Sequence, residues 1–236
     1  MKPVLHWLEL DHLSIFEQLQ LEEALVRTDA RNVCIVNPGS ARAIVMGISG
    51  EPKLLLNTES VFRDEIPVIK RFSGGGTVIV DENTLFVSFI CNHDALPITP
   101  YPEPLLRWTS ELYQQSWQIP SFALQEQDYA IGSRKCGGNA QYIRKGKWVH
   151  HTSFLWDYKE TNMDYLQLPA KRPKYRADRP HSEFLCRLKD VSPSKKFLID
   201  QLKNELVKRF YIEDFCLKNL SFPPHRQATQ QISMKS

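Results

Sequence analysis

The 236-residue sequence contains no run approaching the roughly 18 apolar residues that a membrane-spanning helix requires. Its first residues hold no continuous apolar core, and the acidic side chains of Glu9, Asp11 and Glu17 come early. They therefore resemble neither a secretory signal peptide nor an organellar transit peptide. We expect a cytoplasmic protein without a membrane partner; a mitochondrial or other organellar location is the alternative if a leader has been removed.

Cysteine is also sparse, with five residues that are far apart and form no Cys-x-x-Cys pair. Disulfide frameworks and zinc sites depend on such closely spaced cysteines, so the sequence predicts neither, and no motif supplies metal ligands. We therefore expect a reducing compartment. The net charge of +3 is too small to indicate a nucleic-acid partner, and the sequence contains no recognition motif for nucleic acid.

Glycine is scarce as well, and seven of the ten glycines lie within 74–76 and 132–146. The first group stands between a basic pair, Lys70 and Arg71, and a β-branched run over 77–80. Because glycine lets a ligand approach the main chain closely, the N–H groups of such a loop can hold a carbonyl or a phosphate. The alternative is a flexible turn between two strands.

The second glycine region contains the candidates for chemistry. Lys135 lies between glycine-bearing turns, where an ammonium can stabilise negative charge on an acyl carbonyl or a phosphate; the alternative is an exposed hairpin lysine. Cys136 is either a nucleophile or a small core residue. His150 and His151 point to opposite faces of a strand, so we expect one in the site and one packed elsewhere. The concentration of glycine predicts that both regions face one site.

Apolar periodicity gives the coarse organisation of the chain. Runs rich in apolar and β-branched residues predict strands over 4–10, 32–36, 43–46, 77–80, 85–91, 139–143 and 148–156. A capping box at Ser14 and Glu17 predicts a helix to about Thr28, and apolar spacing predicts a second helix over 105–117. Ser192-Pro193 predicts the start of a third helix.

Three further expectations concern turns and loops. Strands 77–80 and 85–91 are predicted to be neighbours around a tight turn, and residues 145–147 to form a hairpin turn. Residues 167–190 combine basic side chains with prolines, which indicates an extended, mobile loop that binds a nucleotide or an acidic protein, or is simply a solvated surface. Residues 223–236 are predicted to be a disordered tail.

Three motifs in this order resemble one known family. Arg71-Phe-Ser73-Gly-Gly-Gly76-Thr-Val78 resembles the lipoate-binding loop of the lipoate–protein ligase A family, within the biotin and lipoate protein ligase superfamily. Lys135-Cys-Gly-Gly-Asn-Ala140 followed by His150-His151-Thr152 resembles its lysine motif and its histidine strand, and Leu21-Glu-Glu-Ala-Leu25 agrees as well. The resemblance covers roughly residues 13–190 and implies an α/β fold, with a mixed β-sheet flanked by helices in a single catalytic domain over 1–222.

The resemblance also implies site residues. Lys135 would bridge the acyl carbonyl and the phosphate of an adenylate. Substrate-binding residues would be Arg71, Ser73, Gly74, Gly75, Gly76, Thr77, Val78, Asp128, Asn139, Ala140 and His151. The basic loop would cover the nucleotide through Lys171, Lys174, Arg176 and Arg179.

The reaction implied by the resemblance has two steps. Lipoate or octanoate would attack ATP, with Mg²⁺ on the phosphates, to give an acyl adenylate and pyrophosphate. A lysine of a lipoyl domain would then take the acyl group as an amide. The implied acceptors are E2 subunits of 2-oxoacid dehydrogenases and the H protein of glycine cleavage.

The sequence departs from the family pattern in ways that keep alternatives open. Val80-Asp81 stands where the family often has His-Asp, and Gly-Gly-Asn-Ala stands where it has Gly-Ser-Ala. No C-terminal accessory domain follows, so a separate accessory subunit or a compact form is expected. An ATP-independent octanoyl or lipoyl transferase that uses Cys136 is the main alternative, and Cys136→Ala would inactivate it but not a ligase. A non-catalytic binder of carrier domains is another alternative, while a biotin ligase is disfavoured because its Gly-Arg-Gly-Arg-x-Gly loop is missing.

Overall fold

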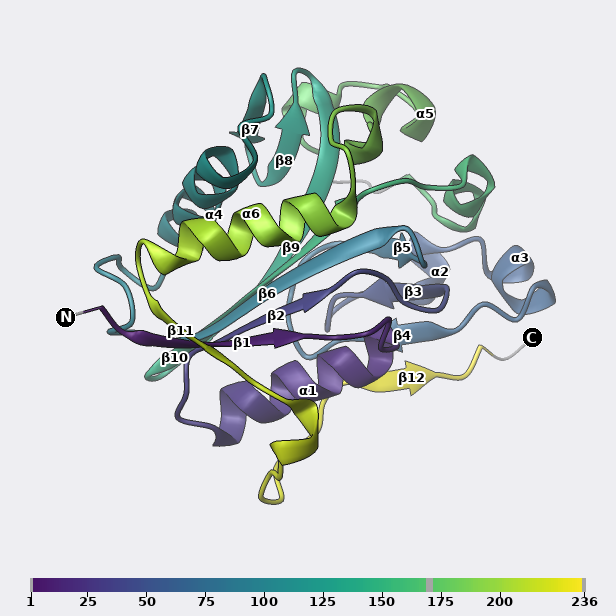
Figure 1. Cartoon of the computed structure of the whole chain (residues 1–236). Coiled ribbons are helices and arrows are strands. Elements are labelled where there is room, and N and C mark those ends of the chain that lie inside the picture. Colours follow the sequence, from purple (N-terminus) through teal and green to yellow (C-terminus); the bar gives the residue numbers. More distant parts are fainter. Residues whose placement is uncertain (1, 169–171, 235–236) are drawn as a thin grey trace.

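The computed structural model describes residues 2–168 and 172–234, which form a mixed α/β fold built on two sheets (Figure 1). The larger sheet has the strand order β11-β1-β2-β6-β10-β9-β8-β7, and the smaller has the order β12-β4-β3-β5. The strands are β1 (Val4–Glu9), β2 (Val33–Asn37), β3 (Ala43–Met46), β4 (Val68–Lys70), β5 (Val78–Val80), β6 (Thr84–Asn92), β7 (Phe122–Gln125), β8 (Asp128–Ile131), β9 (Arg134–Arg144), β10 (Lys147–Leu155), β11 (Tyr211–Asp214) and β12 (Gln230–Ile232).

Helices cover both faces of the larger sheet. They are α1 (Ile15–Thr28), α2 (Pro52–Leu55), α3 (Thr58–Arg63), α4 (Pro102–Trp117), α5 (His181–Phe184) and α6 (Lys195–Val207), with short 3₁₀ turns at η1 (Glu160–Tyr165), η2 (Lys174–Arg176), η3 (Leu188–Asp190) and η4 (Leu217–Asn219). None of these helices is long and apolar enough to cross a membrane. A mixed sheet flanked by helices confirms the fold class that the sequence predicted.

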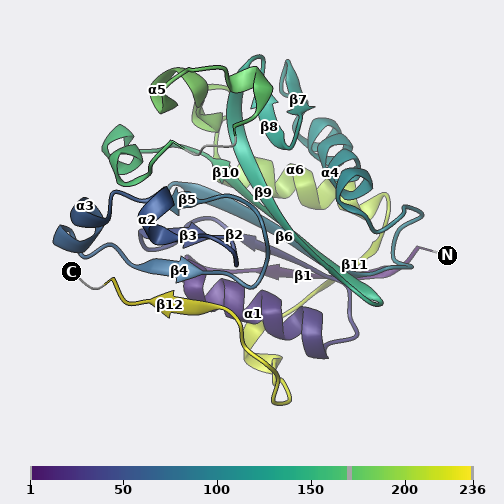
Figure 2. The ribbon, with the colours of Figure 1, turned by 180° about the vertical axis from the view of Figure 1, so that it is seen from behind.

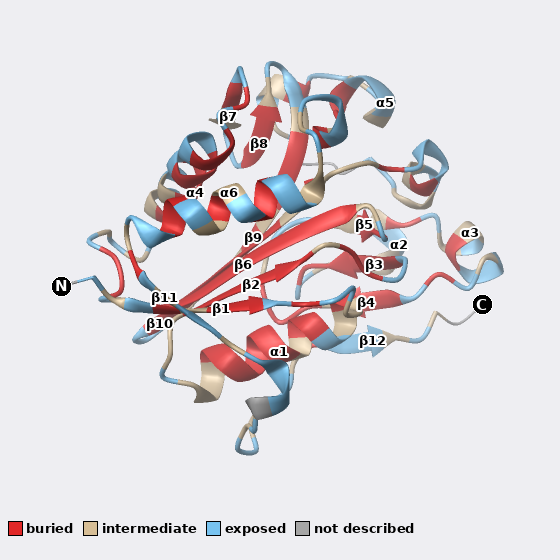
Figure 3. Ribbon diagram, viewed as in Figure 1, coloured by how far each residue is buried: buried red, intermediate tan, exposed pale blue. Residues whose placement is uncertain are grey.

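The central strand β6 shows how the core is divided. Alternate side chains of a strand point to opposite faces of the sheet. Val87 and Phe89, separated by one residue, face α4 and α6, while Phe86 and Ile90 face α1. All four side chains are buried, and Figure 3 shows strand β6 coloured as buried along nearly all of its length. The two faces of the larger sheet therefore carry separate apolar layers, and Ile15 and Leu19 of α1 share an apolar cluster with residues of both sheets.

Several local predictions are confirmed. Helix α1 begins after Ser14, whose hydroxyl accepts the N–H of Glu17 as the capping box requires. Helix α4 covers the predicted range 105–117 and begins slightly earlier. Strands β9 and β10 form the predicted hairpin, with Gly146 at φ +83° in the turn. Glycine is favoured there because positive φ is strained for other residues.

The predicted pairing of strands 77–80 and 85–91 is wrong. Strand β5 pairs with β3 in the smaller sheet, whereas β6 pairs with β2 and β10 in the larger one. The turn at Asp81 moves the chain from one sheet to the other, and the Asp81 carbonyl accepts the N–H groups of Ser40 and Thr84. Since both strands are mostly buried on both faces, alternation of polar residues does not reveal their partners.

Two predictions near the C-terminus are corrected. The last long helix begins at Lys195 rather than at Pro193, because the Ser194 hydroxyl accepts the N–H of Phe197 and caps it. The predicted disordered tail contains the edge strand β12, which pairs antiparallel with β4. The carboxylate of Glu23 on α1 holds this segment by accepting the N–H groups of Ala228 and Thr229, both at 2.8 Å.

This anchor gives a prediction about stability. Burial alone would raise the pKa of Glu23, but hydrogen bonds from Thr229, Ala228 and Arg27 lower it below its ordinary value of 4.5. We expect Glu23→Gln to lose about 1–3 kcal/mol of unfolding free energy, because charge-assisted hydrogen bonds become neutral or unpaired. Urea unfolding measures this loss, and Glu59→Gln, at an exposed position on α3, is the control.

The pH dependence tests the same contact. A carboxylate with a lowered pKa in the folded state stabilises the protein above its unfolded pKa, and this stabilisation is lost as the pH falls through the folded pKa. The difference between wild type and Glu23→Gln should therefore be full at neutral pH and shrink below about pH 4.5. A difference that grows on acidification would contradict the assigned role of Glu23.

Candidate active site

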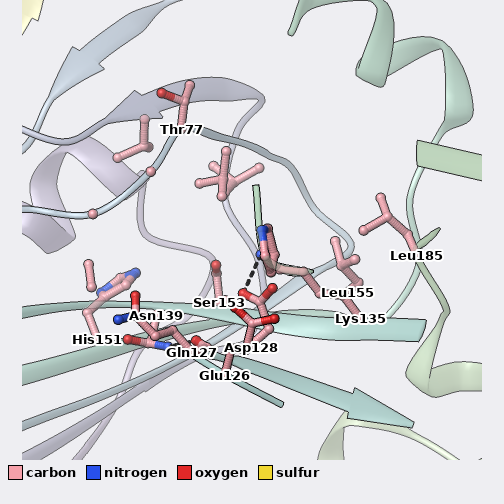
Figure 4. Close-up of a pocket in the computed structure, with 18 of the residues that line it drawn as sticks. Thr77, Glu126, Gln127, Asp128, Lys135, Asn139, His151, Ser153, Leu155 and Leu185 are labelled. Carbon is pink, nitrogen blue, oxygen red and sulfur yellow. Dashed lines mark hydrogen bonds and ion pairs between the residues drawn. The ribbon is translucent and has the colours of Figure 1, made fainter. Parts of the chain in front are cut away.

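A cavity of about 1580 Å³ opens between the two sheets and brings both glycine regions together (Figure 4). Its walls include Gly75 to Val80 from the glycine loop and β5, and Lys135 and Gly138 to Ala140 from β9. An added Cβ at Gly75 would lie 3.5 Å from the Asn139 carbonyl and 3.6 Å from the Ala140 side chain. The two regions therefore face one site, as the sequence predicted.

Arg71 shapes the glycine loop from inside. Its guanidinium is buried and donates to the Gly74 carbonyl at 2.7 Å and to the Gly76 carbonyl at 2.9 Å. Burial lowers the pKa of Arg71 to about 10, and the charge of Glu22 opposes this shift, so the side chain stays cationic at neutral pH. Gly75 has φ +103°, and a Cβ there would lie 2.6 Å from the Arg71 guanidinium. A residue other than glycine at position 75 would be strained by its φ and would have to displace the Arg71 guanidinium.

A β-bulge in β9 sets the direction of Lys135. Ala130 of β8 pairs with Lys135 and Tyr129 pairs with Gly137, so Cys136 is an extra residue on β9. Because of this extra residue, Lys135 and Gly138 share the cavity face although they are three positions apart. The Lys135 ammonium lies 2.8 Å from the Asp128 carboxylate (Figure 4).

The two glycines after Cys136 have separate steric roles. A Cβ at Gly138 would lie 3.2 Å from the Lys135 ammonium, so the missing side chain makes room for that group. A Cβ at Gly137 would lie 2.6 Å from the Phe154 ring, which is fully buried in the core. One glycine thus serves the cavity and the other serves the packing behind it.

A buried acid–histidine pair forms part of the cavity wall. His151 lines the cavity, and its Nδ1 lies 2.9 Å from Glu22 Oε1. The same oxygen accepts hydrogen bonds from Ser88 at 2.7 Å and from Gln18 at 2.9 Å. Burial alone would raise the pKa of Glu22, but His151, Ser88 and Gln18 lower it, so the carboxylate is charged at neutral pH.

His150 points the other way, as the strand geometry predicted. It is buried between Tyr129 and Gln141, which lie 2.9 Å from its two ring nitrogens. Burial lowers the pKa of His150 to about 3, so this imidazole is neutral. His150 is a structural residue of the core, and His151 is the one that faces the cavity.

The basic loop is more ordered than the sequence suggested. In the described part, Arg176 is buried with its guanidinium 4.7 Å from the Phe184 ring centroid. Tyr175 donates a hydrogen bond from its hydroxyl to the Asp128 carboxylate at 3.0 Å. These contacts position the loop against β8, where Arg172, Arg176 and His181 line the cationic end of the cavity. The prediction of an extended segment is therefore wrong for residues 172–186, which contain η2 and α5.

The structure brings most of the expected site residues to the cavity. Lining residues among them are Arg71, Gly75, Gly76, Thr77, Val78, Asp128, Lys135, Asn139, Ala140, His151 and Arg176. Ser73, Gly74, Lys174 and Arg179 lie outside the lining, and Lys171 lies outside the described residues. Arg179 instead donates to the Tyr175 and Ser133 carbonyls and holds the loop in place.

Cys136 does not reach the cavity. Its thiol is buried on the core side of β9, donates to the Tyr129 carbonyl at 3.3 Å, and has its pKa raised by burial. A thiol in this position has no access to an acyl group bound in the cavity. The nucleophile suggested for this residue is therefore not supported.

Sequence reasoning missed Glu22, His181 and Phe184 as parts of the site. Glu22 carried a usable signal, because it lies on the apolar face of α1 in line with Ile15 and Leu19, where an acid needs a partner. His181 and Phe184 lie in the basic loop and carried no local signal. Among the described residues, no group of three acidic, histidine or cysteine side chains could hold a metal ion.

Comparison with known proteins identifies the family. The chain matches the family described as the lipoyl protein ligase A/B catalytic domain over residues 14–211. The chain therefore belongs to this family.

A curated relative from Plasmodium falciparum (isolate 3D7), named inactive lipoate–protein ligase 2, is 30% identical over 79% of this chain and 64% of its own length. The chain thus spans less than two thirds of that relative.

Solved structures show the same fold at low sequence identity. Lipoate-protein ligase A bound with ATP has a TM-score of 0.73 at 18% identity, covering 92% of this chain and 91% of that one. A bi-partite lipoate protein ligase from Thermoplasma acidophilum, studied with its E2 lipoyl domain, also has a TM-score of 0.73, at 19% identity, covering 92% of this chain and 89% of that one.

The acid–histidine pair yields a prediction. We expect Glu22→Gln to cost about 3 kcal/mol of unfolding free energy at neutral pH, because a buried pair that loses its charge leaves polar groups uncompensated. Since Glu22 has a lowered pKa, its contribution is present above its ordinary value of 4.5 and lost as the pH falls further. Urea unfolding of both proteins at pH 7 and pH 4 measures this; an equal difference at both pH values would contradict the charged state of Glu22.

Proposed function

We propose that this chain is a lipoate–protein ligase. It activates lipoate or octanoate with ATP and Mg²⁺ to an acyl adenylate, and transfers the acyl group to a lysine of a lipoyl domain. The observation that carries the proposal is the placement of the Lys135 ammonium, which is held in the cavity by Asp128 and faces the glycine loop.

The cavity has an apolar part suited to an acyl chain. Ile15 of α1, Val45 of β3 and Phe86 of β6 line it together with the Ala140 methyl group. The His151 ring packs against Phe86 with ring centroids 5.8 Å apart. Apolar walls with a few placed polar groups are typical of small-molecule sites.

The other part of the cavity is suited to a polyanion. Arg172, Arg176 and His181 line it, and Arg176 Nη2 is buried without a hydrogen-bond partner among the described residues. The same holds for the Thr77 hydroxyl on the opposite wall. Buried polar atoms without partners are costly, so both groups favour a ligand that completes their hydrogen bonding. A nucleotide phosphate meets this need at Arg176.

Lys135 lies where the two parts meet. As a carboxylate attacks the α-phosphate, negative charge develops on phosphate and carbonyl oxygens, and a positioned ammonium stabilises it. Asp128 holds the ammonium, and Gly138 leaves space for it. Mg²⁺ is expected to enter with ATP on its phosphates, since no protein metal cluster was found among the described residues.

The acceptor is proposed from the relatives. The Thermoplasma acidophilum ligase was studied with its E2 lipoyl domain. We propose lipoyl domains of this kind, including the glycine-cleavage H protein, as acceptors here. Because that ligase is bi-partite, we also propose that transfer by this chain requires a separate accessory subunit.

A second candidate function follows from the name of the Plasmodium relative. A protein that keeps the fold without activity would bind carrier domains and form no adenylate. The Lys135–Asp128 pair and the partnerless Arg176 favour catalysis. An ATP-independent transferase is disfavoured because Cys136 lies outside the cavity.

The first test measures pyrophosphate release from ATP and Mg²⁺ with free lipoate or octanoate, without acceptor and under reducing conditions. We expect pyrophosphate release that requires the added lipoate or octanoate. In Lys135→Ala the rate of this release should fall at least ~100-fold, which is the size of effect that removal of one preorganised electrostatic group has. Cys136→Ala should retain it. If the wild type releases no pyrophosphate but transfers an octanoyl group from a carrier protein, the result would favour an ATP-independent transferase. If it neither forms an adenylate nor transfers an acyl group, the result would favour a non-catalytic binder of carrier domains.

The two glycines after Cys136 provide a matched pair of variants. We expect Gly138→Ala to lower pyrophosphate release roughly tenfold with little change in stability, because its methyl group displaces the Lys135 ammonium. Gly137→Ala should instead lose about 1–3 kcal/mol of unfolding free energy, because its methyl group overlaps the Phe154 ring. Rate assays and urea unfolding of both variants check this; a Gly138→Ala enzyme with full activity would show that the ammonium has other room.

A further inference from the structure

Two thiols from distant parts of the chain meet behind Lys135. Strand β10 pairs with β9 only as far as Gly137. At Lys135, two residues earlier in β9, the segment that follows α5 lies along the same edge of β9 (Figure 2). Lys135 pairs in parallel with Leu185, and the Cys186 N–H donates to the Lys135 carbonyl at 2.9 Å. Cys136 and Cys186 are the residues that follow this isolated bridge on the two segments.

The usual spacing of neighbouring strands is compatible with a disulfide between residues that follow such a bridge. Neighbouring strands lie about 4.8 Å apart, which falls within the ~4.4–6.8 Å between Cα atoms that disulfides require. Both side chains point to the same face, since both belong to the apolar cluster under α4. The Cys136 thiol donates to the Tyr129 carbonyl and the Cys186 thiol to the Arg134 carbonyl, both at 3.3 Å. The neighbouring Cys136 thiol lowers the pKa of Cys186, while burial raises the pKa of Cys136.

We propose that Cys136 and Cys186 form a reversible disulfide that links residues 172–186, the loop at the cationic end of the cavity, to the strand of Lys135. Arg176, His181 and Phe184 of that loop line the cavity, so the link fixes one wall of the site. The proposal goes beyond the ligase activity and does not depend on it.

The oxidant is a hydroperoxide. Cys186 reacts first, because it is 7% exposed while Cys136 is fully buried. Its thiolate attacks one peroxide oxygen, the O–O bond breaks, and a sulfenic acid and hydroxide form. The Cys136 sulfur then attacks the Cys186 sulfur, the S–O bond breaks, and the departing hydroxyl takes the thiol proton. In total, two thiols and one hydrogen peroxide give one disulfide and two water molecules.

The chain contains its own control pair. Cys34 and Cys91 are fully buried on adjacent strands, but Cys34 pairs with Phe89 and Cys91 is two residues further along β6. Such diagonal neighbours lie about 7–8 Å apart, beyond the ~7 Å limit for a disulfide. The same oxidant should therefore leave this pair unlinked in the folded protein.

The test oxidises the reduced, full-length protein with hydrogen peroxide, blocks remaining thiols by alkylation, and digests it with trypsin without reductant. We expect peptide 136–144 linked to peptide 177–187, with a mass two hydrogen atoms below their sum. The linked species should disappear with dithiothreitol and be absent in Cys186→Ser. Cys216→Ser, which removes an exposed thiol, should retain it.

The effect on the loop is read by limited proteolysis, which requires no activity. Trypsin should cleave after the exposed Lys174 several-fold more slowly in the oxidised protein, and dithiothreitol should restore the rate. The proposed disulfide is contradicted if Cys136 and Cys186 are recovered as alkylated thiols after oxidation. It is also contradicted if Cys186 is oxidised to a sulfinic acid without a link to Cys136, or if Cys34 and Cys91 form a disulfide as readily. A linked protein with an unchanged cleavage rate would overturn the role in fixing the loop.

Discussion

The extra residue at position 136 decides which face of the sheet each following side chain of β9 points to, and the geometry of the site depends on this residue. Without the bulge, Lys135 and Gly138 would point to opposite faces of the sheet, since three residues is an odd spacing. With it, the ammonium lies over the bare backbone of Gly138 and beside Asp128. The same bulge turns both Cys136 and Gly137 toward the core. There Cys136 shares an apolar cluster with Cys186, and Gly137 lies against the Phe154 ring. One local irregularity thus serves both sides of the sheet.

Helix α1 connects this site to the rest of the molecule through two adjacent carboxylates. Glu22 contacts His151, which lines the cavity, and Glu23 accepts a hydrogen bond from the segment before β12. That strand pairs with β4, whose last residue is followed directly by Arg71 and the glycine loop. Both carboxylates are buried and fully hydrogen-bonded, which is the condition under which charge is tolerated inside a protein. The helix therefore stabilises the floor of the cavity and the small sheet at once.

Local sequence signals predicted local structure well. The capping box at Ser14, the hairpin at Gly146 and the opposite faces of His150 and His151 follow from rules that act over a few residues. The sequence also predicted that the two glycine regions face one site, because glycines leave the main chain open to the close approach of a ligand. The fold class followed from the resemblance to one family.

Contacts between distant segments could not be predicted in this way. The pairing of β5 with β3 depends on packing between two sheets, and both strands read alike because they are mostly buried on both faces. The neighbours of Cys136 depend on the bulge, which adjacent glycines suggest but do not locate. Order in the basic loop comes from Tyr175 and Arg176, whose partners lie far away in the sequence. Composition indicated mobility there because it does not register such partners.

The space shared by Lys135 and Gly138 has a consequence for the history of the family. A methyl group at position 138 would lie 3.2 Å from the Lys135 ammonium, so a substitution at one of these positions affects the space open to the other. In a lineage that abandons the chemistry, the constraint on the glycine is released together with the constraint on the lysine. Substitutions at positions 135 and 138 are therefore expected to occur together in a relative that does not need the ammonium.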